Sequence, residues 1–158
     1  SFTLIIIGYK YNKGGSAIMY KNILLAYDFD NSFNNVPEEL QNLTAGVDDA
    51  EITVFHVILE SELETSVRYD NKHFEDLAHE KSEILKPFVN KLEDLGLNVN
   101  IRFSTGYIKN SILSEIKEHS YDIIVMSNTR TKSDIKNILG NVTHKIASNV
   151  DIPVLIVN

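Results

Sequence analysis

The sequence predicts an α/β protein, a three-layer sandwich built on a five-stranded, parallel, doubly wound sheet. Three observations support this prediction. Short apolar segments of strand length alternate with longer segments of helical periodicity. The connections are long enough for crossover helices, which join parallel strands by right-handed connections. The apolar segments are also nearly continuous runs, as expected for strands that helices cover on both faces.

The five predicted strands are apolar and rich in β-branched residues, a composition that favours extended structure. Asp28 follows the first strand, and the turn-forming residues Ser104, Thr105 and Gly106 follow the third. In a doubly wound sheet, ligands usually bind beyond the carboxyl ends of the strands where the strand order reverses, and strands one and four are the expected neighbours of that crevice. The predicted strands are 23–27, 52–57, 99–103, 121–126 and 153–157.

Four segments between the strands carry helical signals. Segment 36–47 has Pro37 at an early position, where a missing backbone N–H does no harm. Segment 71–95 repeats apolar residues mostly at spacings of three or four and stops at Gly96, with a bend expected at Pro87. The other two predicted helices are 111–119 and 135–149.

Composition excludes several classes of function. The formal net charge of -7 gives no overall field that attracts nucleic acid or an anionic membrane. The chain has no cysteine, which excludes disulfides and thiolate chemistry and fits a reducing, cytoplasmic compartment. Its apolar runs are far shorter than the roughly 20 residues that span a bilayer. We therefore expect a soluble cytoplasmic protein that has neither nucleic acid nor membrane as a partner.

The N-terminal segment differs from the rest of the chain. Residues 13–16 (KGGS) have the composition of a flexible joint, and Met19 precedes the first predicted strand directly. We interpret residues 1–18 as a leader or N-terminal extension and residues 19–158 as the domain. An additional native strand within residues 1–18 is the alternative.

Four stretches of the domain stand out by their order and spacing: 20–28 (YKNILLAYD), 56–57 (HV), 121–127 (YDIIVMS) and 149–157 (NVDIPVLIV). Together they resemble the universal stress protein family. The resemblance implies a Rossmann-like fold of the adenine nucleotide alpha hydrolase-like type. It also implies a regulatory or binding module of the stress response, not a dedicated enzyme, and a homodimer formed through the C-terminal strand.

Nucleotide-binding members of this family have an aspartate at the end of strand one and a G-x2-G-x9-G-[ST] loop after strand four. Asp28 matches the aspartate and Gly140 matches the last glycine. Ser127 and Arg130 replace the first two glycines, and Asn141 replaces the Ser or Thr. Because a phosphate cradle needs close backbone N–H groups and often positive φ, these replacements put the nest in doubt.

Other features of the same loop favour an anion. Arg130 and Lys132 offer charge to phosphate oxygens, and a helix that begins near Gly140 offers backbone N–H groups. The resemblance thus implies ATP or another adenine nucleotide as ligand, with Mg only alongside ATP. At the adenosine end it implies Ala26, Asp28 and Val57, and along the ribose and phosphate path Met126, Ser127, Arg130, Gly140, Asn141 and Val142.

Competing interpretations assign no catalytic or metal-binding residue. Asp28 could instead accept hydrogen bonds from the turn 29–32 that follows it. An acidic phosphoacceptor pocket, as in response-regulator receivers, fails because 104–106 has no aspartate and no lysine follows strand five. The histidines lack metal-ligand spacing, and His56 lies within an apolar strand as expected for a core residue. A weak adenine-nucleotide hydrolase and a structural dimer without nucleotide remain the alternatives.

Overall fold

The computed structural model describes residues 4–7, 20–127 and 140–157. They form one six-stranded sheet with the order β1-β6-β5-β2-β3-β4. Strands β2 to β6 run parallel to their neighbours, and β1 pairs with β6 antiparallel. The strands are β1 Leu4–Ile7, β2 Asn22–Ala26, β3 Glu51–Leu59, β4 Asn98–Gly106, β5 Ile123–Ser127 and β6 Val154–Val157.

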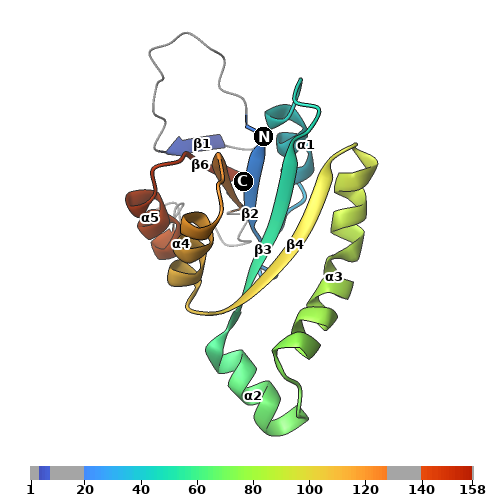
Figure 1. Cartoon of the computed structure of the whole chain (residues 1–158), viewed down its shortest axis with the longest axis vertical. Coiled ribbons are helices and arrows are strands. Elements are labelled where there is room, and N and C mark those ends of the chain that lie inside the picture. Colours follow the sequence, from blue (N-terminus) through green and yellow to red (C-terminus); the bar gives the residue numbers. More distant parts are fainter. Residues whose placement is uncertain (1–3, 8–19, 128–139, 158) are drawn as a thin grey trace.

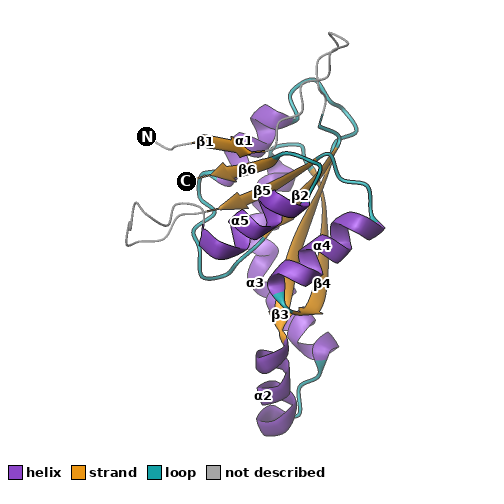
Figure 2. Cartoon of the chain, turned by 90° about the vertical axis from the view of Figure 1, so that its left-hand side faces the viewer, coloured by secondary structure: helices purple, strands orange, loops and turns teal. Residues whose placement is uncertain are grey.

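Helices cover both faces of the sheet and complete a three-layer sandwich (Figure 1). Figure 2 shows α4 and α5 on one side of the sheet and α1 and α3 on the other. The remaining helix, α2, lies beyond the carboxyl ends of β3 and β4. The helices are α1 Val36–Leu43, α2 Glu60–Asp70, α3 Phe74–Asp94, α4 Ile108–Glu118 and α5 Gly140–Asn149.

Strand β2 shows how the sequence produces two cores. Its side chains alternate between faces, as in any strand. Ile23 and Leu25 enter the core under α1 and α3, whereas Leu24 and Ala26 enter the core under α4 and α5. Each of these four side chains is at most 8% exposed. The apolar run of β2 is therefore continuous because both faces of this central strand are buried.

The predicted architecture is confirmed in its main features. All five predicted strands are present, they are mutually parallel, and helices lie on both sides of the sheet. The structure adds β1 as a sixth strand, which places residues 4–7 at the edge of the sheet beside β6. Strands β3 and β4 are longer than predicted, since they stay paired up to Leu59 and Gly106.

Helix α2 was missed by the sequence analysis. Ser66 is its only buried residue, so burial imposes almost no helical periodicity on the segment. Asn71 adopts a left-handed conformation with φ of 52° and separates α2 from α3. For this reason the long helix begins at Phe74 and not at residue 71. Pro87 lies inside α3 without ending it.

The boundaries of two other helices also differ from the prediction. Helix α1 ends at Leu43, because the Thr44 hydroxyl donates to the Leu40 carbonyl and Gly46 follows with φ of +80°. A turn therefore replaces the predicted final helical turn up to residue 47. Helix α5 spans Gly140–Asn149, and the predicted portion 135–139 lies outside the described residues.

Candidate functional site

The strand order of the sheet reverses between β2 and β5, which makes this position a topological switch point. From β2 the chain builds β3 and β4 on one side, and then crosses over to add β5 and β6 on the other. In doubly wound sheets the carboxyl ends of the two strands at such a switch point border a ligand crevice. Ala26 and Met126 pair across this point, near the ends of the two strands.

Three predicted site residues meet on one face at this end of the sheet. Ala26 and Val57 are buried, and Met126 packs against the same cluster, which lies beneath α4 and α5. Val142 of α5 contacts this cluster as well and is partly buried. The structure therefore brings together four apolar residues that the sequence analysis had drawn from β2, β3, β5 and α5.

Asp28 lies in the turn that follows β2. Its Oδ1 accepts a hydrogen bond of 2.9 Å from the backbone N–H of Asp30, and its Oδ2 accepts one of 3.0 Å from Asn31 Nδ2. The turn-forming role expected for Asp28 is thus confirmed. Because each carboxylate oxygen carries two acceptor positions, the same side chain retains capacity for a ligand donor.

Ser127, the last residue of β5, connects the two sides of the switch point. Its hydroxyl donates to the backbone carbonyl of Ser32, in the loop between β2 and α1. The position expected for the first glycine thus holds a side chain that contacts the opposite loop. Sequence reasoning missed Ser32, since no local pattern relates residues 95 positions apart.

The remaining predicted residues belong to the phosphate side of the site. Arg130 lies within 128–139, outside the described residues. Gly140 and Asn141 belong to the first turn of α5 as the structure describes it. Early backbone N–H groups of a helix point along its axis and suit an anion. The described geometry therefore covers the adenosine side of the predicted site more fully than the phosphate side.

The other face of the same sheet end carries an aromatic cluster. His56 Nδ1 lies 2.8 Å from the Tyr27 carbonyl oxygen, and the His56 ring meets Phe29 edge to face. Lys81 Nζ lies 5.0 Å from the centre of the Phe29 ring. Burial lowers the pKa of His56, although its bond to Tyr27 acts in the opposite direction. His56 is therefore a partly buried residue whose ring nitrogen has a hydrogen-bond partner, and not a fully buried core residue.

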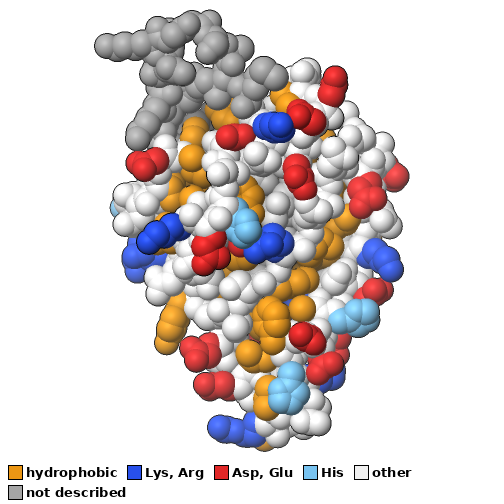
Figure 3. Space-filling model, in the orientation of Figure 1, with side chains coloured by type: hydrophobic (Ala, Val, Ile, Leu, Met, Phe, Trp, Pro, Cys, Tyr) orange, Lys and Arg blue, Asp and Glu red, His pale blue; other side chains and the backbone are white. Residues whose placement is uncertain are grey.

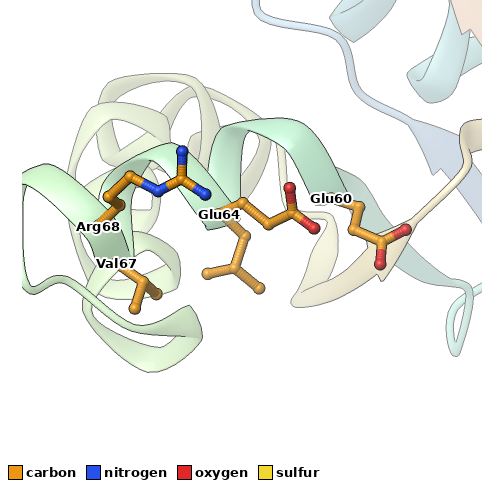
Figure 4. Close-up of a pocket in the computed structure, with 5 residues that line it drawn as sticks. Glu60, Glu64, Val67 and Arg68 are labelled. Atoms are coloured by element: carbon orange, nitrogen blue, oxygen red, sulfur yellow. The ribbon is translucent and has the colours of Figure 1, made fainter.

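Two shallow depressions border α2, away from the switch point. One is lined entirely by residues of this single helix, and Figure 4 shows Glu60, Glu64, Val67 and Arg68 around it. The other lies between α2 and the start of α3 and includes Lys72. Since a surface formed by one helix encloses little of a ligand, these depressions are weaker candidates than the crevice.

Further features limit the chemistry that the described residues can perform. Among the described residues, no group of three His, Cys, Asp or Glu side chains is placed to hold a metal ion. Acidic and basic side chains are interspersed on the face drawn in Figure 3. No helix in the described part of the chain combines the length and apolar character needed to cross a membrane.

The strand order and the helices on both faces define a doubly wound α/β domain with a topological switch point between β2 and β5. Residues 19–158 match the model of the universal stress protein family. Universal stress protein YxiE from Bacillus subtilis is 26% identical over 148 residues, which cover 88% of this chain and 99% of that protein. The chain belongs to the universal stress protein family.

Solved structures agree with this assignment. Hypothetical protein MJ0577 is 26% identical, with a TM-score of 0.72 over 89% of this chain and 96% of that one. Universal stress protein UspA from Lactobacillus plantarum shares the fold at 21% identity, with a TM-score of 0.68 over 90% and 100% of the two chains. Three more distant structures of this fold are complexes with cAMP, with dAMP and with AMP.

Proposed function

We propose that this chain is a regulatory binding module of the stress response that binds an adenine nucleotide at the β2–β5 switch point. The observation that carries the proposal is that Ala26, Val57 and Met126 lie together on one face of the sheet. Ala26 is the last residue of β2, and Asp28 follows it two residues later in the chain. An apolar floor beside a carboxylate suits a purine nucleoside, which offers a flat base and several hydrogen-bond donors.

The complexes of the distant relatives support the choice of ligand. They contain cAMP, dAMP and AMP, which share the adenine base, a pentose and a phosphate. The dAMP sugar lacks the 2′-hydroxyl, and the cAMP phosphate closes a ring with the sugar and carries less charge. Proteins of this fold therefore bind adenine nucleotides that differ in the sugar and in the phosphate. For this chain we propose ATP or a related adenine nucleotide, with Mg as companion of ATP only.

Isothermal titration of the purified protein with ATP and Mg is the direct test. The protein is first checked by mass spectrometry for a co-purified nucleotide. We expect micromolar binding, on the order of 8 kcal/mol of binding free energy, or an adenylate that is already bound. No heat up to millimolar ATP, with an empty protein, would contradict the proposal and favour a structural module without nucleotide.

Asp28→Ala identifies the site. We expect this variant to lose nucleotide affinity, because it removes the carboxylate beside the apolar floor. Asp30→Ala is the matched control, since Asp30 reaches Asp28 through its backbone N–H and the substitution leaves that bond in place. An unchanged dissociation constant in Asp28→Ala would exclude Asp28 from the site.

The competing function is a weak adenine-nucleotide hydrolase on the same fold. It would require a base or a metal near the phosphates, and the described residues contain no metal-binding group. We propose a binding module and not an enzyme, in keeping with the universal stress protein family to which the chain belongs. Slow ATP turnover that persists through purification and disappears in Asp28→Ala would establish the hydrolase instead.

We also propose that the protein acts in the cytoplasm as a homodimer formed through β6. The absence of cysteine supports a reducing compartment. The continuous apolar character of β6, which is buried at all four positions, supports its place inside an extended sheet. Because β1 pairs with β6 in this structure, such a dimer requires β1 to leave that edge.

A further inference from the structure

A hydrogen bond to Asp28 fixes the orientation of the Asn31 side-chain amide. Its Nδ2 donates to Asp28 Oδ2 at 3.0 Å, and its backbone N–H donates to the Asp28 carbonyl at 3.2 Å. An ionised carboxylate only accepts hydrogen bonds, so the amide nitrogen must face Asp28. The amide oxygen, Oδ1, must therefore face away from it.

This oxygen is a buried acceptor without a donor. Asn31 Oδ1 exposes less than 1 Å² and has no hydrogen-bond partner among the described residues. A buried acceptor left without a donor is costly, and most buried polar atoms in proteins are satisfied. The residue as a whole is partly buried, so Oδ1 lies close to the protein surface.

Asn31 lies in the loop that borders the switch point. The next residue, Ser32, accepts the hydrogen bond from Ser127 at the end of β5. Asn31 therefore lies in the loop segment that joins the two sides of the switch point. Asn31 Oδ1 and the Asp28 carboxylate are therefore two acceptors of the same turn, which follows β2.

Two acceptors in this place select one part of an adenine nucleotide. Phosphate is disfavoured, because the Asp28 carboxylate would repel its charge. The base fits the apolar residues Ala26, Val57 and Met126. The pentose lies between base and phosphate, and its hydroxyls are donors of the kind that two acceptors require.

We infer that Asn31 Oδ1 accepts a hydrogen bond from a ribose hydroxyl of the bound nucleotide, next to Asp28. This inference rests on the proposed function and specifies which atoms of the ligand the loop after β2 recognises. It makes Asn31 a residue that distinguishes nucleotides by their sugar hydroxyls, whereas the apolar floor serves the base.

A thermodynamic cycle of two protein variants and two ligands tests the inferred hydrogen bond between Asn31 and the ribose. ATP and 2′,3′-dideoxy-ATP are titrated into the wild type and into Asn31→Leu, which has similar volume but no acceptor. We expect Asn31→Leu to weaken ATP binding about tenfold and dideoxy-ATP binding less than about twofold, since the hydroxyl partner is already absent from the second ligand. Asn34→Leu, an exposed site in the same loop, is the matched control.

The outcomes separate this inference from the proposed function. Equal weakening of both ligands would show that Asn31 only positions Asp28, and unchanged affinities would show no contact; either result overturns the inference while ATP binding stands. A wild type that binds neither ligand overturns the proposed function and the inference with it. Circular dichroism establishes that Asn31→Leu is folded, and Asn31→Ala, which also lacks a side-chain acceptor, replaces it if it is not.

Discussion

His56 Nδ1 lies 2.8 Å from the backbone carbonyl oxygen of Tyr27, so the imidazole ties β3 to the end of β2. Burial lowers the pKa of His56 below 6.5, with Lys81 acting in the same direction. The unfolded chain titrates near 6.5, so it binds more protons than the folded protein between the two pKa values. The free energy of unfolding should therefore decrease as the pH falls through that window.

His56→Gln isolates this contribution from those of other titrating groups. We expect urea unfolding to show that the wild type loses stability relative to His56→Gln as the pH falls from about 7.5 through the window below 6.5. Above this window the difference between the two proteins should be constant. Parallel stability curves over the whole range would show that His56 has the same pKa in both states.

Tyr121 should produce the opposite dependence in alkali. Its hydroxyl donates at 2.8 Å to Oε2 of Glu115, a carboxylate only 5% exposed that Arg102 also contacts. Burial, with help from Glu115, raises the pKa of Tyr121 from 10.0 to about 12. Between these values the unfolded chain loses the proton that the folded protein keeps, so stability should fall as the pH rises through this window.

Tyr121→Phe tests this account at two pH values. Near pH 7 we expect a loss of about 1 kcal/mol, because Glu115 loses one donor while Arg102 still neutralises it. Above about pH 10 the wild type should approach the variant in stability. Unfolding then releases the Tyr121 proton in the wild type, whereas the variant has no such proton to release. A difference that is independent of pH would contradict the raised pKa.

Gly106 ends β4 in a backbone conformation that side chains resist. Its φ is +133°, and a Cβ atom there would lie 3.3 Å from Ser111 Oγ. We expect Gly106→Ala to lower the free energy of unfolding by about 1–3 kcal/mol. Gly96→Ala is the control, because Gly96 also has positive φ but open space around it. Equal losses in thermal or urea unfolding would show that contact with Ser111 adds nothing.

The sequence predicted the layers of this fold well because burial on both faces leaves a simple pattern. Leu24 and Leu25 are adjacent and enter opposite cores, so β2 reads as a continuous apolar run. The same reasoning failed for α2, which buries only Ser66 and so carries no apolar stripe. Helix ends failed where a local hydrogen bond decides, as Thr44 does for α1.

The site was predictable only as far as position along strands determines it. Asp28 and Met126 stand at strand ends, and parallel pairing brings those ends together. The contact between Ser127 and Ser32 depends on the path of a loop, which no periodicity encodes. The orphaned acceptor of Asn31 likewise follows from the orientation of one amide and emerges only from coordinates.

The N-terminal strand determines whether β6 has a free edge. Leu4 to Ile7 pair antiparallel with Val157 to Val154, and β5 occupies the other side of β6. Deletion of residues 1–18 should expose the backbone N–H and C=O groups of β6 on the β1 side. Unpaired edges associate with other strands, and a twofold axis would pair two β6 strands.

Light scattering coupled to size-exclusion chromatography measures the result. We expect the chain that lacks residues 1–18 to dimerise at lower concentration than the full chain, because β1 no longer competes for the edge. Deletion of residues 1–3 is the matched control, since it leaves the paired residues Leu4 to Ile7 in place. A truncated protein that stays monomeric would show that β6 is not the dimer interface. Equal dimerisation of both chains would place the interface elsewhere or show that β1 yields its position readily to a second β6.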